Sequence, residues 1–143
     1  MGYIGGNIFY GAVLGTILTV AAIVIDKKYT ILTLGIVATL IDFMMGSGFF
    51  MVIPTFISAI GFEAVLLTSE PYAGSMKINI IGAATFGILS RISFSGFNMV
   101  FFGMVLPDWM FAFMLFVPIL SFALGGLIGT SMGKRIKTSL ISL

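Results

Sequence analysis

The chain has 143 residues, of which 59% are hydrophobic and 8% are charged, and its formal net charge is +2. Soluble domains carry about 25% charged residues, so this composition excludes a water-soluble fold. Its apolar runs are continuous rather than alternating in segments of about ten residues, which favours transmembrane helices over a β-barrel. We therefore expect an all-α fold: a polytopic bundle of transmembrane helices in which residues 1–143 form a single domain.

The sequence contains no cysteine and no histidine. This excludes thiolate nucleophiles, histidine-ligated metals and haem, and Ser-His-Asp catalysis. A Gly-rich phosphate-binding loop after a strand is also absent, so the chain is not expected to hydrolyse ATP. We predict that the protein is not an enzyme, carries no cofactor or metal, and does not bind nucleic acid.

Five apolar runs follow one another along the chain. The first runs from about Gly6 to Ile25, and the second, from Thr30 to about Met45, is short for a span. The fourth run contains Arg91 near its middle, so it predicts either one tilted helix or two short helices. One helix gives five spans in all, and two give six. The remaining expected spans are 49–68, 78–103 and 109–135.

The basic residues indicate the topology. With five spans, six of the seven basic residues fall on one side of the membrane, and the positive-inside rule places that side in the cytoplasm. The N-terminus would then lie outside and the C-terminus inside, in a multi-pass protein of the cell membrane. Six spans would place both termini inside, but charge and segment length favour five. The six residues are Lys27, Lys28, Lys77, Lys134, Arg135 and Lys137.

Three charged residues lie within apolar runs, where a charge costs a few kcal/mol or more unless a partner or a water-filled cavity receives it. Asp42 and Arg91 are expected at the same depth, so we predict that they form a pair, either structural or part of a binding site. Glu63 is expected about 7 Å from the end of its helix, where it either caps a loop, reaches the interface, or contacts a ligand or ion. Asn79 and Asn98 are further polar candidates, expected to bond to neighbouring helices.

Small residues recur at every fourth position in the first and last runs. Gly11 and Gly15 share one face of the first helix. Such faces let two helices approach until their backbones touch, so we predict helix packing or docking onto a partner. The longest such ladder lies in the last run: Ser121, Gly125, Gly129 and Gly133. An aromatic belt at the span ends is expected from Tyr3, Tyr10, Tyr29, Tyr72 and Trp109.

Three stretches of the chain resemble the substrate-binding S components of energy-coupling factor transporters. They are the Gly11-xxx-Gly15 face, the stretch Gly61-Phe62-Glu63 with the polar loop and residues 80–84 after it, and the Gly-rich last helix ending at Gly133-Lys134-Arg135. The resemblance implies capture of a vitamin or similar small solute on the outer side, with transport depending on a coupling membrane subunit and ATPases. It also implies that Gly11 and Gly15 face the coupling subunit. That family has six spans, whereas the charge pattern here favours five.

A second interpretation is a non-catalytic accessory or structural subunit of a larger membrane complex. A solute-binding component is expected to be a stable monomer with a closed polar pocket. An accessory subunit is expected to bury its glycine ladders against foreign helices. Both interpretations predict other membrane subunits and the lipid bilayer as partners, and the first adds a small-molecule solute.

Overall fold

The computed structural model describes residues 2–46 and 48–142, with side chains described from residue 8 onward except at 49 and 50. Five helices and no strand occur in these ranges, which confirms the all-α class. Three of the helices are long and apolar enough to cross a membrane: α1, α4 and α5. The elements are α1 (Gly2–Ile25), α2 (Thr30–Met44), α3 (Phe49–Leu66), α4 (Met76–Phe102) and α5 (Asp108–Ile141).

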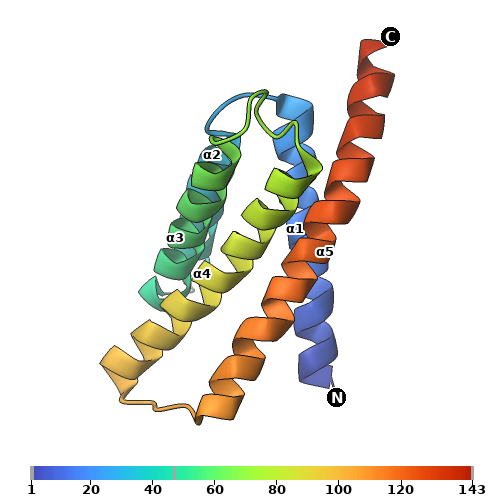
Figure 1. Ribbon diagram of the computed structural model, residues 1–143. Coiled ribbons are helices and arrows are strands. Elements are labelled where there is room, and N and C mark those ends of the chain that lie inside the picture. Colours follow the sequence, from blue (N-terminus) through green and yellow to red (C-terminus); the bar gives the residue numbers. More distant parts are fainter. Residues whose placement is uncertain (1, 47, 143) are drawn as a thin grey trace.

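Successive helices run in opposite directions, so the two termini lie at opposite ends of the molecule (Figure 1). The α1–α2 loop, the start of α4 and the end of α5 share one end, which we call the basic end because these segments carry six of the seven basic residues. This arrangement follows from an odd number of helices joined by short loops.

The fourth run forms one continuous helix, so the alternative of two short helices is wrong. The serines near Arg91 do not break the helix. For example, the Ser90 hydroxyl donates to the carbonyl of Gly87 in the same helix, at 2.9 Å. The helix ends at Gly103, whose φ of 62° is a left-handed conformation that glycine adopts without strain.

The helices differ strongly in length. α2 has 15 residues and is about 22 Å long, whereas α4 has 27 residues and is about 40 Å long. The turn between α2 and α3 therefore lies well short of the loop that joins α4 to α5 (Figure 1). At the other extreme, α5 runs past the predicted end at residues 133–135 to Ile141, because no proline or glycine interrupts residues 134–141.

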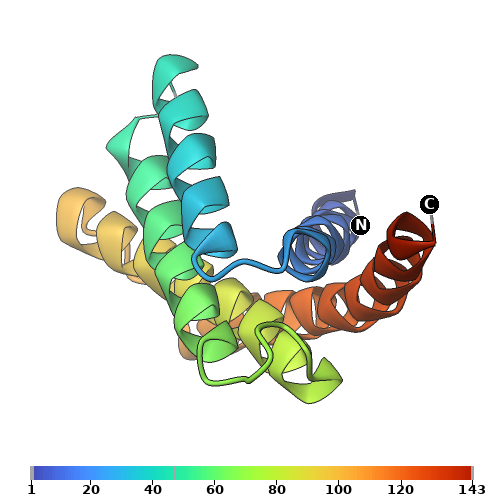
Figure 2. The same ribbon diagram turned by 90° about the horizontal axis from the view of Figure 1, so that it is seen from above.

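Seen from above, the helices form two pairs bridged by α4 (Figure 2). α1 packs chiefly against α5 and α2 against α3, while α4 contacts both α3 and α5. The side chains with no exposed surface gather near the basic end, where Ile31, Phe62 and Leu66 form the centre of the core. α1 and α2 touch only slightly, so the side of the bundle between them is loosely closed.

The glycine ladders of α1 and α5 pack against each other. A Cβ on Gly125 would lie 2.6 Å from the Ala12 carbonyl oxygen and 2.9 Å from the Cα of Gly15. A Cβ on Gly11 would lie 2.5 Å from the Ser121 hydroxyl oxygen, and that hydroxyl donates to the Ile8 carbonyl. The two backbones are therefore in direct contact, as small-residue faces permit.

The same contact continues toward the basic end. A Cβ on Gly129 would lie 2.7 Å from the Cβ of Thr19, and one on Gly133 would lie 3.0 Å from the Ile23 side chain. All six small residues singled out in the sequence therefore take part in packing within the chain. The faces proposed for partner docking are already occupied, so a partner would have to use another surface.

Substitution of Gly125 by alanine tests this close contact. Gly125→Ala places a methyl group against backbone atoms that cannot move aside, so we expect destabilisation by about 1–3 kcal/mol and a lower melting temperature in detergent. Gly96→Ala is the matched control, because nothing lies within 4 Å of a Cβ there and alanine is the better helix former. Equal melting temperatures for the two variants would contradict backbone contact between α1 and α5.

Candidate functional site

The carboxylate of Glu63 binds the start of α2. Its Oε1 accepts a hydrogen bond from the Tyr29 N–H at 2.7 Å. Its Oε2 accepts from the N–H groups of Ile31 at 2.9 Å and Leu32 at 3.2 Å. Glu63 is only 3% exposed, so the carboxylate is held inside the protein by these donors. Of the roles predicted for Glu63, the structure shows loop and helix capping.

The start of α2 needs this carboxylate because its own sequence provides no cap. Tyr29 occupies the N-cap position with φ 70°, and its side chain makes no capping bond. The first N–H groups of a helix have no acceptor within the helix, and its N-terminus carries a partial positive charge. A carboxylate from α3 supplies both the acceptor and the opposite charge.

Tyr72, in the α3–α4 loop, completes this site. Its hydroxyl donates to Oε2 of Glu63 at 2.9 Å, and the ring is 7% exposed. Burial raises the pKa of the Tyr72 hydroxyl well above its ordinary value, and the nearby Glu63 carboxylate raises it further. The hydroxyl thus remains a donor over the physiological range. The expected place of Tyr72 in an aromatic belt is wrong, because its ring packs inside the loop.

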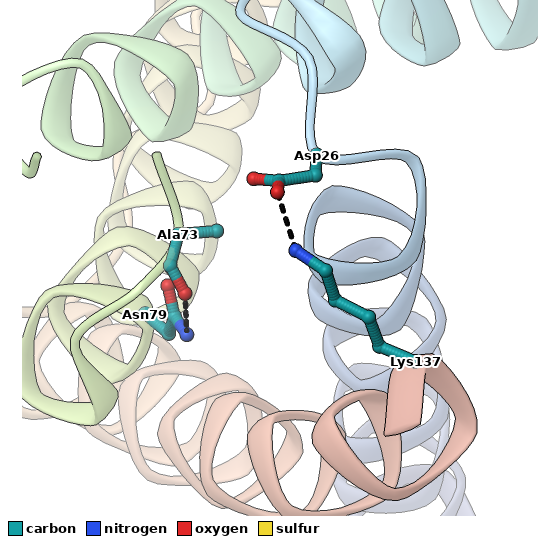
Figure 3. A network of polar contacts seen from close by, with 4 residues as sticks. All are labelled: Asp26, Ala73, Asn79 and Lys137. Atoms are coloured by element: carbon teal, nitrogen blue, oxygen red, sulfur yellow. Dashed lines mark hydrogen bonds and ion pairs between the residues drawn. The ribbon is translucent and has the colours of Figure 1, made fainter. Parts of the chain in front are cut away.

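Asn79 fixes the start of α4 to α5 and to the preceding loop. Its amide donates to the Ala73 carbonyl at 2.9 Å (Figure 3). It also donates to the Thr130 hydroxyl oxygen at 3.1 Å. It has no exposed surface, and the bond to Thr130 is the contact with a neighbouring helix that the sequence predicted. On the right of the same view, Lys137 of α5 forms an ion pair with Asp26, the residue that follows α1.

Asn98 behaves differently from Asn79. Its amide donates to the carbonyl of Phe94, one turn earlier in α4, at 2.8 Å. The expected bond to a neighbouring helix is replaced by one within its own helix. The α2–α3 hairpin does not extend to the C-terminal part of α4, so this part of α4 has fewer neighbouring helices (Figure 1).

A partly open cavity of about 460 Å³ lies between the helices, and all five helices contribute to its wall. Asp42 of α2 and Arg91 of α4 both line it, and both are partly exposed. The structure therefore brings the two charges to one cavity, as their equal depth suggested, while direct pairing between them stays a prediction. The apolar part of the wall includes Leu14, Leu18, Ile31, Leu34, Ala38, Met51, Pro54, Ala59, Phe86, Phe94 and Phe122.

Two packed phenylalanine rings form part of the cavity wall. The rings of Phe86 and Phe122 lie 5.2 Å apart between centroids with an interplanar angle of 35°, and both side chains are almost fully buried. The Phe122 ring packs closely against Gly87, because a Cβ at Gly87 would lie 2.9 Å from that ring. A buried aromatic pair that cannot shift presents a rigid apolar surface to whatever occupies the cavity.

Three polar residues of the wall were not expected from the sequence: Tyr10, Thr55 and Ser90. The Thr55 hydroxyl donates to the Met51 carbonyl at 2.9 Å, and that of Ser90 donates within α4, so both oxygens keep lone pairs that can accept from a ligand. No periodic signal marks these positions, because they converge only when α1, α3 and α4 are brought together.

The arrangement can bind but has no visible catalytic constellation. Within the described residues, no group of three Asp or Glu side chains could hold a metal ion. An apolar cavity with a few convergent polar groups and a volume of several hundred Å³ is typical of small-molecule sites. No protein-family model, curated protein or solved structure matches the chain.

Substitution of Glu63 tests the capping role. Glu63→Gln keeps the shape of the side chain but removes its charge and turns one acceptor into a donor that faces backbone N–H groups. We expect a loss of about 2 kcal/mol or more in stability, seen as a lower melting temperature. Glu70→Gln makes the same change at an exposed position in the α3–α4 loop, so it is the matched control and should leave the melting temperature unchanged. A fully stable Glu63→Gln variant would show that the cap is dispensable.

Proposed function

We propose that the chain is a multi-pass membrane protein that binds a small solute, as the substrate-binding component of an uptake transporter whose coupling and ATPase subunits are separate chains. The observation that carries this proposal is the cavity in which Asp42 and Arg91 line a largely apolar wall. Charged groups at such depth are expensive in hydrocarbon and usually mark a binding site or pathway. A purely structural role would not require a cavity beside them.

The distribution of charge supports an orientation. Six of the seven basic residues lie at the basic end, and Asp108 is the acidic residue at the start of α5 on the opposite end. The positive-inside rule then favours a cytoplasmic basic end and an external N-terminus. This orientation does not depend on whether α2 and α3 cross fully, because a hairpin returns the chain to the side where it began.

The short α2–α3 hairpin supports access to the cavity from outside. α2 is about 22 Å long against a hydrocarbon thickness of about 30 Å, so its turn would lie within the outer part of the bilayer. Met44, the last residue of α2, and Met45 after it are apolar and highly exposed, at 85% and 78%, which suits contact with lipid rather than water. Asp42 lies within one helical turn of these residues and lines the cavity. A solute from the outer side would meet the cavity at this level.

The accessory-subunit alternative has less support. It expected glycine ladders buried against foreign helices, and these ladders already pack between α1 and α5. The resemblance to S components of energy-coupling factor transporters is consistent with the cavity. It implied a docking role for Gly11 and Gly15, however, and a coupling subunit would have to dock on another face.

Single cysteines test the proposed membrane placement, since the chain has no cysteine of its own. Met45→Cys and Val105→Cys replace side chains with nearly equal exposure, 78% and 79%, that differ in depth. We expect an impermeant thiol reagent on intact cells to label Val105→Cys but not Met45→Cys, because a thiol in hydrocarbon does not ionise. Leu140→Cys should react only after the cells are opened.

Two results would overturn this placement. Equal labelling of Met45→Cys and Val105→Cys would mean that the α2–α3 turn reaches water and the hairpin crosses fully. Labelling of Leu140→Cys on intact cells would reverse the proposed orientation.

Filling the cavity tests solute binding. Ala38 lines the cavity, whereas its neighbour Val37 points outward and is 48% exposed, so Ala38→Trp blocks the site and Val37→Trp is a matched control. We expect the wild type and Val37→Trp in lipid nanodiscs to retain a small molecule from a cellular metabolite extract, seen as a mass adduct by native mass spectrometry. Ala38→Trp should lose it. The same adducts on all three proteins, or none on any, would contradict the proposal.

A further inference from the structure

The basic end of the molecule holds a cluster of positive charges that the protein itself does not neutralise. Six basic residues lie there against two acidic ones, Asp26 and Glu70. Asp26 pairs with Lys137, whereas the other five basic side chains are exposed and make no hydrogen bond or ion pair with any residue that the structure describes. These five are Lys27, Lys28, Lys77, Lys134 and Arg135.

The fold brings these charges together from three segments of the chain. The ion pair between Lys137 and Asp26 places the end of α5 beside the α1–α2 loop, which carries two of the exposed lysines (Figure 3). The start of α4, with Lys77, is fixed to α5 by the hydrogen bond from Asn79 to Thr130. Like charges that are held at one end repel one another, so an anion that lies against them stabilises this arrangement.

Exposed apolar and aromatic side chains lie within two residues of these charges along the chain. Tyr29 follows Lys28 and is 56% exposed, while Ile25, Met76 and Ile136 are also exposed beside basic residues. Tyrosine is enriched where the hydrocarbon of a membrane meets its headgroups, and lysine and arginine place apolar stems in hydrocarbon and charges among the headgroups. This combination is typical of protein surface at the headgroup level.

The opposite end of the molecule has a different charge but a similar aromatic side chain. From residue 92 to residue 115, which includes the end of α4 and the start of α5, Asp108 is the only charged residue in the sequence. Trp109 follows it and is 73% exposed. The two ends thus both present an aromatic ring to lipid, and they differ in the sign of their charge.

We propose that the basic end binds the headgroup of an anionic phospholipid, with its phosphate among the basic side chains and its acyl chains along the exposed apolar side chains beside them. The apolar surface selects a lipid over a soluble anion, because a free phosphate makes no use of it. Each basic residue near an anionic membrane surface favours binding by about fivefold. The inference goes beyond solute binding, since it requires neither the cavity nor a transported molecule.

The chain's single tryptophan, Trp109, provides an internal control for the test. A brominated acyl chain quenches the fluorescence of a tryptophan that it touches. Brominated phosphatidylglycerol, which is anionic, and brominated phosphatidylcholine, which is zwitterionic, therefore show which lipid lies at the reporter. In the unmodified protein Trp109 reports on the end without basic residues. Trp109→Phe combined with Tyr29→Trp moves the reporter to the basic end, again at an exposed position.

In vesicles that contain both lipids, we expect phosphatidylglycerol to be preferred over phosphatidylcholine by about fivefold or more at the Tyr29→Trp reporter. No preference is expected at Trp109. The preference should disappear at high salt concentration, where exposed charges are screened. Native mass spectrometry of the unmodified protein from nanodiscs of the two lipids should show retained phosphatidylglycerol, and this measurement does not depend on the folding of any variant.

Charge-neutralising variants in the same reporter protein identify the residues responsible. Replacing four basic residues of the α1–α2 loop and α5 by glutamine should bring the ratio of the two lipid affinities close to one. Thr138→Gln with Ser139→Gln is the matched control, because it places glutamine at exposed positions of α5 without a change of charge. The four substitutions are Lys27→Gln, Lys28→Gln, Lys134→Gln and Arg135→Gln.

Several outcomes would overturn the proposal. The same preference at both reporters, no preference at the basic end, or a preference that the four substitutions leave unchanged would each contradict it. If inorganic phosphate at constant ionic strength removes the preference, the basic end binds a soluble anion instead of a lipid. None of these results affects the metabolite adduct, so solute binding in the cavity is tested separately.

Discussion

The start of α2 has backbone N–H groups that no nearby side chain in its own sequence accepts, and such groups are costly when they are buried without a partner. Glu63 meets this requirement from α3 with both carboxylate oxygens, while Tyr72 holds the same carboxylate from the following loop. One buried anion therefore connects α2, α3 and the α3–α4 loop. The core side chains Ile31, Phe62 and Leu66 pack around this point. The helices diverge from this fixed end, and the cavity opens between them.

The remainder of the fold depends on two contacts of a different kind. α1 and α5 meet through backbone contact along the glycine ladders, whereas α4 is joined to α5 through buried Asn79 and Thr130. α4 therefore connects a rigid glycine-packed pair to the capped α2–α3 hairpin. Because α1 and α2 touch only slightly, the space between the two units is not filled by packing. Asp42 and Arg91 line the cavity that lies in this space.

The apolar runs, the small-residue periodicity and the charge positions predicted five helices, their order and the contact surfaces of α1 and α5. The roles of Glu63 as a cap and of Asn79 as an interhelical donor could also be foreseen, because buried polar groups require partners. The backbone N–H groups that Glu63 accepts, those of Tyr29, Ile31 and Leu32, could not be foreseen. The need for this cap arises from the left-handed turn at Tyr29. Tyr72 looked like a belt residue because distance from a span end does not show which way a ring points. The cavity could not be predicted from the sequence either, because its presence depends on how far α2 lies from α1 and α4.

The pairing of α1 with α5 joins the first and last helices of the chain. Contacts between segments so distant in sequence close a long loop, and such contacts form late in folding. During synthesis α1 emerges first, and its glycine face has no partner until α5 follows more than 80 residues later. The intervening α2–α3 hairpin can form on its own through the Glu63 cap once residue 63 has been made. The α2–α3 hairpin thus forms before the contact between α1 and α5, so the bundle is completed only after α5 has been made.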